Sequence, residues 1–226
     1  MAARIILIVA LLALSSSRAL ASDPSPLQDF CVADFDSIVI VNGFPCKDPT
    51  SVTADDFYIS GLDKVADTDN DLGANITLVN VNRLPGINTL GVAMSRIDYA
   101  PFGLNPPHSH PRSSEILHVV KGTLYAGFVT SNTDKGNTLI AKKLNTGDAF
   151  VFPQGLIHFQ FNLGDTNAVA FAAFGSQNPG LITVANAVFG SKPPIPEYIL
   201  PLAVQLTKTT VEWLQQQQWV DIAREY

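Results

Sequence analysis

Short apolar stretches separated by turn-forming residues recur between about residues 90 and 189. Each stretch has four to seven residues, the length of a β-strand and too short for most helices. Gly, Pro, Asn and Asp mark turns between them, at 101–103, 121–122, 134–137, 145–148 and 162–165. Evenly spaced short strands predict an all-β sandwich or barrel rather than alternating strands and helices. The predicted strands are Gly91–Ile97, Ile116–Val120, Leu124–Val129, Ala149–Phe152, Ile157–Phe161 and Ala168–Phe174.

The two ends of the chain differ from this region in composition and in sequence pattern. Residues 22–60 are rich in Pro, Asp and Ser, which predicts an irregular arm. After the prolines at 193, 194, 196 and 201, the pattern Thr209-x-x-Glu212 fits a capping box and predicts one or two helices. We therefore divide the chain into a leader (1–21), the arm (22–60), a β-barrel (61–195) and a C-terminal helical extension (196–226).

The first 21 residues have the features of a secretory signal peptide. Arg4 supplies the positive start, 5–14 is an unbroken apolar run, and Ala19-Leu20-Ala21 is a small-x-small cleavage site. A membrane anchor is the alternative, but the run is too short to span a bilayer. We therefore expect a secreted protein that begins near Ser22 and has no membrane partner after cleavage.

Composition narrows the class of partner. The chain has 226 residues, of which 46% are hydrophobic and 15% charged, as in a globular protein. Its net charge is −6, and loss of Arg4 and Arg18 with the leader, which holds no acid, would make it −8. Because an acidic chain lacks the basic face that nucleic acid requires, we expect no nucleic-acid partner.

Export has two consequences for covalent chemistry. Cys31 and Cys46 are the only cysteines, and an even count in an exported protein favours a disulfide over two free thiols. The bridge would close a loop of about 15 residues and contribute roughly 3 kcal/mol in the chain-entropy model. Asn75 begins the only N-x-S/T sequon, so it is a candidate glycosylation site.

The sharpest chemical feature is His108-Ser109-His110. In a strand, residues two apart point to the same face, so both imidazoles would enter one space. Glu115 follows a turn-like segment and would face the same point if the chain reverses there, while His158 would add a third imidazole from a distant strand. Such donors suit Mn, Fe or Zn, and four of them leave about two positions of an octahedral ion open for water or substrate.

An H-x-H pair alone is weak evidence of a metal site, since histidines fall two apart by chance. Here, however, three of the four histidines lie in these two short motifs. The fourth, His118, lies three residues after Glu115 and therefore on the opposite face of a regular strand. We expect His118 to point outward or to pack, unless a bulge turns it inward.

At these residues the sequence resembles the germin-like proteins of the plant cupin superfamily, over most of the mature chain. The resemblance rests on a cysteine box, two cupin motifs and two later segments. The cysteine box is QDFCVAD (28–34) with NGFPC (42–46), and the first cupin motif is PPHSHPR (106–112) with Glu115 and Gly122. The second cupin motif consists of Gly147, Pro153, Gly155, His158 and Asn162. The two later segments are SQNPG (176–180) and FGS (189–191).

The resemblance implies a single cupin β-jelly-roll barrel with a disulfide-stapled N-terminal arm and short C-terminal α-helices. It also implies glycosylation, secretion to the apoplast and cell wall, and a homohexamer, a trimer of dimers clasped by the C-terminal helices. Asn105 and Asn162 are the expected neighbours of the metal ligands. The ligands that it implies for one manganese ion per subunit are His108, His110, Glu115 and His158.

Two departures from the family bear on activity. Oxalate-oxidising germins resemble this chain at Asn105 but carry Asn in place of Ser95 and Gly in place of Phe102. The loss of an amide donor at 95, and a bulkier apolar loop at Phe102 and Leu104, would weaken binding of a polar carboxylate substrate. We therefore rank oxalate oxidation below other activities.

Three functions fit this reading. The leading hypothesis is a defence-related manganese enzyme of the superoxide dismutase type, which produces hydrogen peroxide and needs no pocket for an organic substrate. The second is an oxalate oxidase. The third is a non-enzymatic extracellular metal-binding, receptor or wall protein, although a complete ligand set speaks against a pure storage cupin.

Overall fold

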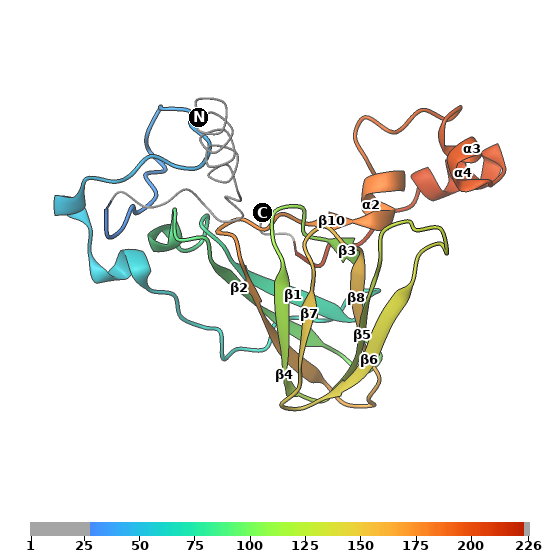
Figure 1. The fold of residues 1–226 in the computed structure, drawn as a ribbon, viewed down its shortest axis with the longest axis horizontal. Coiled ribbons are helices and arrows are strands. Elements are labelled where there is room, and N and C mark those ends of the chain that lie inside the picture. Colours follow the sequence, from blue (N-terminus) through green and yellow to red (C-terminus); the bar gives the residue numbers. More distant parts are fainter. Residues whose placement is uncertain (1–27, 224–226) are drawn as a thin grey trace, which may run out of the picture.

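The computed structural model describes residues 28–223 as a barrel of two antiparallel β-sheets, preceded by an irregular arm and followed by three short helices (Figure 1). The predicted signal peptide lies outside the described residues. Among residues 28–223, no helix is long and apolar enough to cross a membrane. The all-β barrel with short C-terminal helices that the sequence predicts is confirmed.

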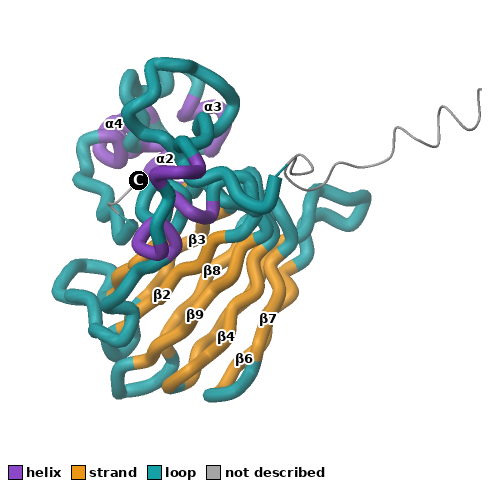
Figure 2. Tube along the Cα trace, turned by 90° about the vertical axis from the view of Figure 1, so that its left-hand side faces the viewer, coloured by secondary structure: helices purple, strands orange, loops and turns teal. Residues whose placement is uncertain are grey.

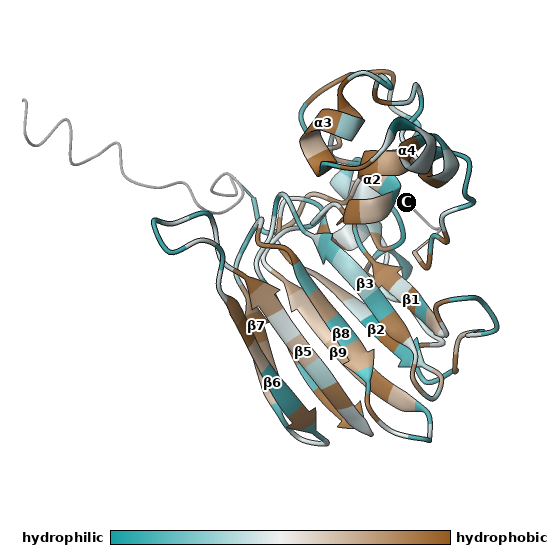
Figure 3. Ribbon diagram, turned by 90° about the vertical axis from the view of Figure 1, so that its right-hand side faces the viewer, coloured by the Kyte–Doolittle hydropathy of each residue, from teal (hydrophilic) through white to brown (hydrophobic). Residues whose placement is uncertain are grey.

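Each sheet contains five strands, and the two sheets face each other across one core. The first sheet, with the order β1-β2-β9-β4-β7, faces the viewer in Figure 2. The second, with the order β10-β3-β8-β5-β6, faces the viewer in Figure 3. The strands are β1 (Ala74–Val79), β2 (Ala93–Tyr99), β3 (Leu104–Ser109), β4 (Glu115–Lys121), β5 (Thr123–Val129), β6 (Leu139–Asn145), β7 (Ala149–Phe152), β8 (His158–Asn162), β9 (Ala168–Phe174) and β10 (Ile182–Thr183).

The six predicted strands all have counterparts, but β1, β6 and β10 were not predicted, and β3 was anticipated only at its His108 end, from the His108-Ser109-His110 spacing. Strand β3 contains Pro106 and Pro107, which cannot donate to a neighbouring strand and so argue against a strand in the sequence. Strand β6 lies at a sheet edge, and Lys142 and Lys143 are exposed there, so its apolar pattern is weak.

Inward-facing side chains of alternate strand residues form the core of the barrel. Burial alternates clearly along β4, β8 and β9, as expected for sheets with one face against a core. The largest fully buried apolar side chains are Tyr99, Phe152, Leu117, Leu124 and Leu144.

The arm before the barrel is held by covalent and charged contacts. The predicted disulfide between Cys31 and Cys46 is present. Further along, Arg96 of β2 forms a buried pair with Asp98 at 2.7 Å and donates to the carbonyl of Leu62 at 2.8 Å. Arg96 therefore ties the segment that follows the arm to the outer face of the first sheet. The short 3-10 helices of this half are Pro49–Ser51, Ala54–Phe57 and Pro85–Ile87.

Three helices, α2 (Val184–Phe189), α3 (Leu200–Val204) and α4 (Lys208–Gln215), lie beyond one end of the barrel (Figure 2). The predicted capping box at Thr209 is wrong. Helix α4 begins earlier, because the hydroxyl of Thr207 accepts from the N–H of Thr210 at 3.2 Å and leaves Thr209 inside the first turn. Pro201 lies in the first turn of α3, where its missing N–H costs no hydrogen bond.

The last described residues return to the barrel. The carbonyl of Ile222 accepts from the N–H of Ile76 in edge strand β1 at 3.0 Å, and the side chains of Ile222 and Ala223 are buried. Covering an edge strand in this way removes a template for pairing with other chains.

Candidate metal centre

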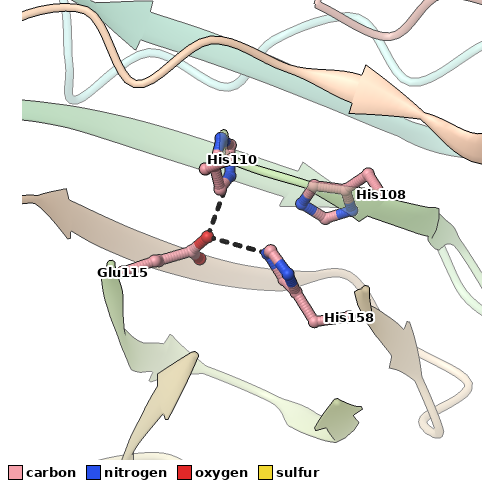
Figure 4. A group of neighbouring side chains, drawn as sticks. All are labelled: His108, His110, Glu115 and His158. Carbon is pink, nitrogen blue, oxygen red and sulfur yellow. Dashed lines mark hydrogen bonds and ion pairs between the residues drawn. The ribbon is translucent and has the colours of Figure 1, made fainter. Parts of the chain in front are cut away.

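The four residues predicted as metal ligands come together at one end of the barrel (Figure 4). All four are at least 95% buried, and one candidate ligand atom from each lies within 4.8 Å of the others. They are His108 in β3, His110 just after it, Glu115 at the start of β4 and His158 at the start of β8. Among the described residues, no other group of histidine, cysteine and acidic side chains has this geometry.

Backbone carbonyls hold all three imidazole rings through Nδ1. His108 Nδ1 lies 2.7 Å from the Pro106 carbonyl, and His158 Nδ1 lies 2.8 Å from that of Leu156. His110 Nδ1 lies 2.6 Å from the carbonyl of Gly180, 70 residues away. A carbonyl only accepts, so each ring donates from Nδ1, and its Nε2 atom is the one left to bind a metal.

Glu115 lies between two of these rings. Its Oε2 atom is 3.1 Å from Nε2 of His110 and 3.2 Å from Nε2 of His158, as the dashed lines in Figure 4 show. With Nδ1 of both rings donating elsewhere, an oxygen this close to both Nε2 atoms requires protons or a cation between them. A buried carboxylate and three imidazole nitrogens converging in this way fit a divalent first-row metal.

The protonation states also suit a cation. Burial, followed by the neighbouring His158 and His110, lowers the pKa of His108 to about 3. Burial alone would raise the pKa of Glu115, but hydrogen bonds from His110 and His158 outweigh it and lower that pKa to about 2. At neutral pH, His108 is therefore an uncharged donor and Glu115 a charged one, which are the forms that bind metal.

Aromatic rings from the core support the ligands. The ring of Phe152 stacks on that of His158 with centroids 4.4 Å apart and an interplanar angle of 19°. The ring of Phe174 contacts His110 edge-on at 4.8 Å. These contacts limit rotation of the imidazoles and exclude water from one side of the site.

A polar layer that the sequence reasoning did not fully identify lies next along the barrel interior. Asn105 donates to Oε1 of Gln160 at 2.6 Å, and the Tyr99 hydroxyl lies 3.5 Å from the same oxygen. The Nε2 atom of Gln160 and the hydroxyl of Ser95 are buried without a hydrogen-bond partner. Gln160 could have been found from the sequence, since it follows His158 by two residues in a strand and so shares its face.

Three other singled-out residues lie away from the ligands. Asn162 is at the opposite end of β8, where its amide donates to the carbonyls of Ala100 and Thr166, so it holds loops together rather than neighbouring the ligands. Phe102 is also at that end, 61% exposed in the turn before β3. It therefore does not narrow the site, contrary to the expectation from sequence. His118 is on the exposed face of β4.

The candidate glycosylation site lies far from this centre in the fold. Asn75 is on edge strand β1, and its amide nitrogen donates to the carbonyl of Asp67 at 2.7 Å. The side chain is half-buried there, beside a surface groove that also contains Thr77 of the sequon.

Comparison with known proteins agrees with this geometry. Residues 60–212 match the Cupin family. The chain is 60% identical to germin-like protein 8-10 of Oryza sativa subsp. japonica, covering 95% of this chain and 96% of that protein.

Two solved structures extend the comparison. Recombinant oxalate oxidase in complex with glycolate is 47% identical, with a TM-score of 0.82, and the match covers 86% of this chain and 96% of that one. Peruvianin-I, a cysteine peptidase from Thevetia peruviana latex, is 39% identical with a TM-score of 0.67, covering 72% and 98%. The chain therefore belongs to the cupin family and, within it, to the germin-like proteins.

Proposed function

We propose that this germin-like protein is a secreted manganese enzyme that dismutates superoxide. Two superoxide anions and two protons would give one hydrogen peroxide and one dioxygen. The observation that carries the proposal is the buried set of three imidazoles and one carboxylate with all Nε2 atoms directed away from their carbonyl partners. When bound, manganese supplies one-electron redox chemistry by alternating between two oxidation states.

The side chains around the site would handle the small anion and its protons. The unpartnered amide N–H of Gln160 and the hydroxyl of Ser95 offer hydrogen-bond donors in the buried polar layer next to the ligands. Tyr99, fully buried, donates its hydroxyl to Oε1 of Gln160 and so orients that amide, and burial, followed by the charge of Glu115, raises the pKa of Tyr99 so that the hydroxyl keeps its proton. A small oxygen anion is a suitable ligand for such donors.

The proposal is tested by measuring bound metal and dismutase activity of wild type, His108→Ala and a matched control, His118→Ala. We expect wild type and His118→Ala to bind one manganese ion and to dismutate superoxide faster than the same concentration of free manganese. His108→Ala should lose both properties. A wild-type protein that holds manganese but gives no rate above free manganese would overturn the enzymatic proposal and favour a metal kept for stability or for a non-enzymatic wall or receptor role.

Oxalate oxidation is a second candidate, because the 47% identical oxalate oxidase shares the fold. Asn105 is in place beside Gln160, but Ser95 is too short to replace an amide donor. If oxalate were the substrate, peroxide release would depend on oxalate, and Ser95→Asn should increase it. No oxalate-dependent peroxide from either protein would exclude this function.

Peptidase chemistry, which the description of Peruvianin-I raises, does not fit this chain. A cysteine peptidase needs a free thiolate. The sequence has two cysteines, and both form the disulfide.

We also propose export to the apoplast, glycosylation at Asn75, and self-association through the C-terminal helices. Large apolar side chains of this region are exposed, including Leu202 at 81% and Tyr198 at 74%, and α3 is mostly brown in Figure 3. Such patches are typical of protein–protein contacts. Sedimentation of wild type and Leu202→Asp tests the contact, since the charged variant should sediment as a smaller species.

A further inference from the structure

One of the three imidazoles is held differently from the others. The carbonyl partners of His108 and His158 are two residues earlier in the chain, so the local backbone fixes these two rings. The partner of His110 is Gly180, in the segment Ser176–Gly180 between β9 and β10. The orientation of His110 therefore depends on what holds this remote segment in place.

Arg112 holds the Gly180 end of the segment. Its backbone N–H donates to the Pro179 carbonyl at 3.2 Å, and its guanidinium donates to the carbonyl and side-chain oxygens of Asn178 at 2.8 and 3.2 Å. The fit is close, because a Cβ at Gly180 would lie 2.8 Å from Nη2 of Arg112. Gly180 also has φ +68°, a conformation that favours glycine.

Gln177 holds the other end against Asn88 and Thr89, which in turn reach the N-terminal arm. Its Nε2 donates to the side chain of buried Asn88 at 3.1 Å, and its Oε1 accepts from the N–H of Thr89. Asn88 in turn donates to the carbonyl of Phe44 at 2.9 Å and lies 3.4 Å from Sγ of Cys31. Contacts thus run without a break from the disulfide-bonded arm to the metal ligand His110.

We propose that Arg112 and Gln177 are positioning residues for the metal centre, which clamp Ser176–Gly180 so that the Gly180 carbonyl fixes the ring of His110. When the clamp is loosened, the carbonyl moves and the ring gains freedom to rotate or to change tautomer. Nε2 of His110 then faces the metal for only part of the time. The disulfide between Cys31 and Cys46, more than 60 residues before His110, becomes linked to the metal site in this way.

The proposal predicts weaker manganese binding without loss of the fold. Removing a direct partner of a ligating histidine typically costs 10–100-fold in metal affinity. Arg112 and Gln177 act one step further out, so we expect about a tenfold loss, the lower end of that range, in Arg112→Ala and Gln177→Ala. Arg112→Lys keeps the charge but not the planar fork, so its loss should be smaller but still measurable.

The experiment compares the manganese dissociation constant, measured by titration of free Mn(II) in EPR spectra, with urea unfolding of the metal-free proteins. Gln217→Ala is the matched control, because Gln217 is half-buried and its Nε2 also donates to a backbone carbonyl, that of Trp213 at 2.7 Å. We expect unchanged affinity in the control, weakened affinity in the clamp variants, and an altered EPR line shape of the bound Mn(II) in those variants alone.

Each result decides the matter. Wild-type affinity and line shape in Arg112→Lys and Gln177→Ala would overturn the proposal, and so would an equal loss of affinity in Gln217→Ala. Should Gln177→Ala fail to fold, the exposed Arg112→Lys variant decides alone. The proposal rests on metal binding, which the proposed function also requires. A wild-type protein that binds no manganese would therefore overturn both. Manganese binding by the wild type with unaffected variants would overturn only the clamp.

Discussion

The link between the core and the metal centre gives a quantitative prediction at Phe152. Its side chain is 1% exposed and stacks on the His158 ring with centroids 4.4 Å apart. Phe152→Ala should lower the free energy of unfolding by about 3–5 kcal/mol, the range for removing a buried phenylalanine. About 0.5–1.5 kcal/mol of that belongs to the stacked pair itself. At roughly 2–4 °C per kcal/mol for a chain of this size, the melting temperature should fall by about 6–20 °C.

The assay combines urea unfolding of the metal-free protein with a manganese titration. Because the ring of His158 loses the wall that fixes it, Phe152→Ala should also weaken manganese binding, by about tenfold. Phe159→Ala is the control, since Phe159 is the next residue of β8, is half-buried and contacts Tyr125 rather than a ligand. A loss of stability below about 1 kcal/mol, or equal effects of both variants on affinity, would refute the reasoning.

Three further predictions concern the Arg96–Asp98 ion pair, the turn at Phe102 and the dependence of stability on pH. Asp98→Ala leaves the guanidinium of buried Arg96 without its carboxylate, so urea unfolding should show a loss of about 3–5 kcal/mol, and an unchanged midpoint would contradict this. Phe102 has φ +59° and an exposed side chain. Phe102→Gly should therefore raise stability in the same assay, by at most about 1 kcal/mol, and a clear loss would count against strain there. In the folded metal-free protein the pKa of His108 is about 3, below the value of about 6.5 in the unfolded chain. Keeping the ring neutral in the folded protein therefore does not lower the free energy of unfolding above about pH 6.5. This free energy should fall steadily as the pH drops from there toward 3. His108→Asn should show a shallower loss between pH 7 and 4, and an identical one would disprove the assignment.

The sequence was sufficient for the class of fold and for the strands with buried faces. The strands Ala149–Phe152 and Ala168–Phe174 were predicted with the observed bounds, because their apolar residues are bounded by turn-forming ones. Of β3 only the His108 end was anticipated, because two prolines precede it. Edge strand β6 was missed because Lys142 and Lys143 interrupt its apolar residues. The start of α4 was misplaced by two residues, since Thr207 and Thr209 are equally good N-cap residues in the sequence alone.

For the site, side-chain types and strand period were informative, whereas the expectation drawn at Phe102 from the family resemblance was wrong. The His108 and His110 pair could be placed on one face from their spacing. Phe102 was expected to make the loop beside the site bulkier because oxalate-oxidising germins carry Gly there, but strand β3 lies between Phe102 and His108 and places Phe102 at the other end of the barrel. The role of Gly180 could not be predicted, because a backbone carbonyl contributed by a remote segment has no signature in the residue type.

The four ligands belong to different sheets, and this has a mechanical consequence. The three histidines come from the β3–β8 side, while Glu115 alone comes from the sheet that contains β4. An ion bound by all four residues would link the two sheets at one end of the barrel, and a single carboxylate would be its only ligand from the second sheet. Metal loading should therefore slow hydrogen exchange of backbone amides around the start of β4, and leave the far edge at β6 exchanging as before. The same ion that serves the chemistry would set how readily this end of the barrel opens.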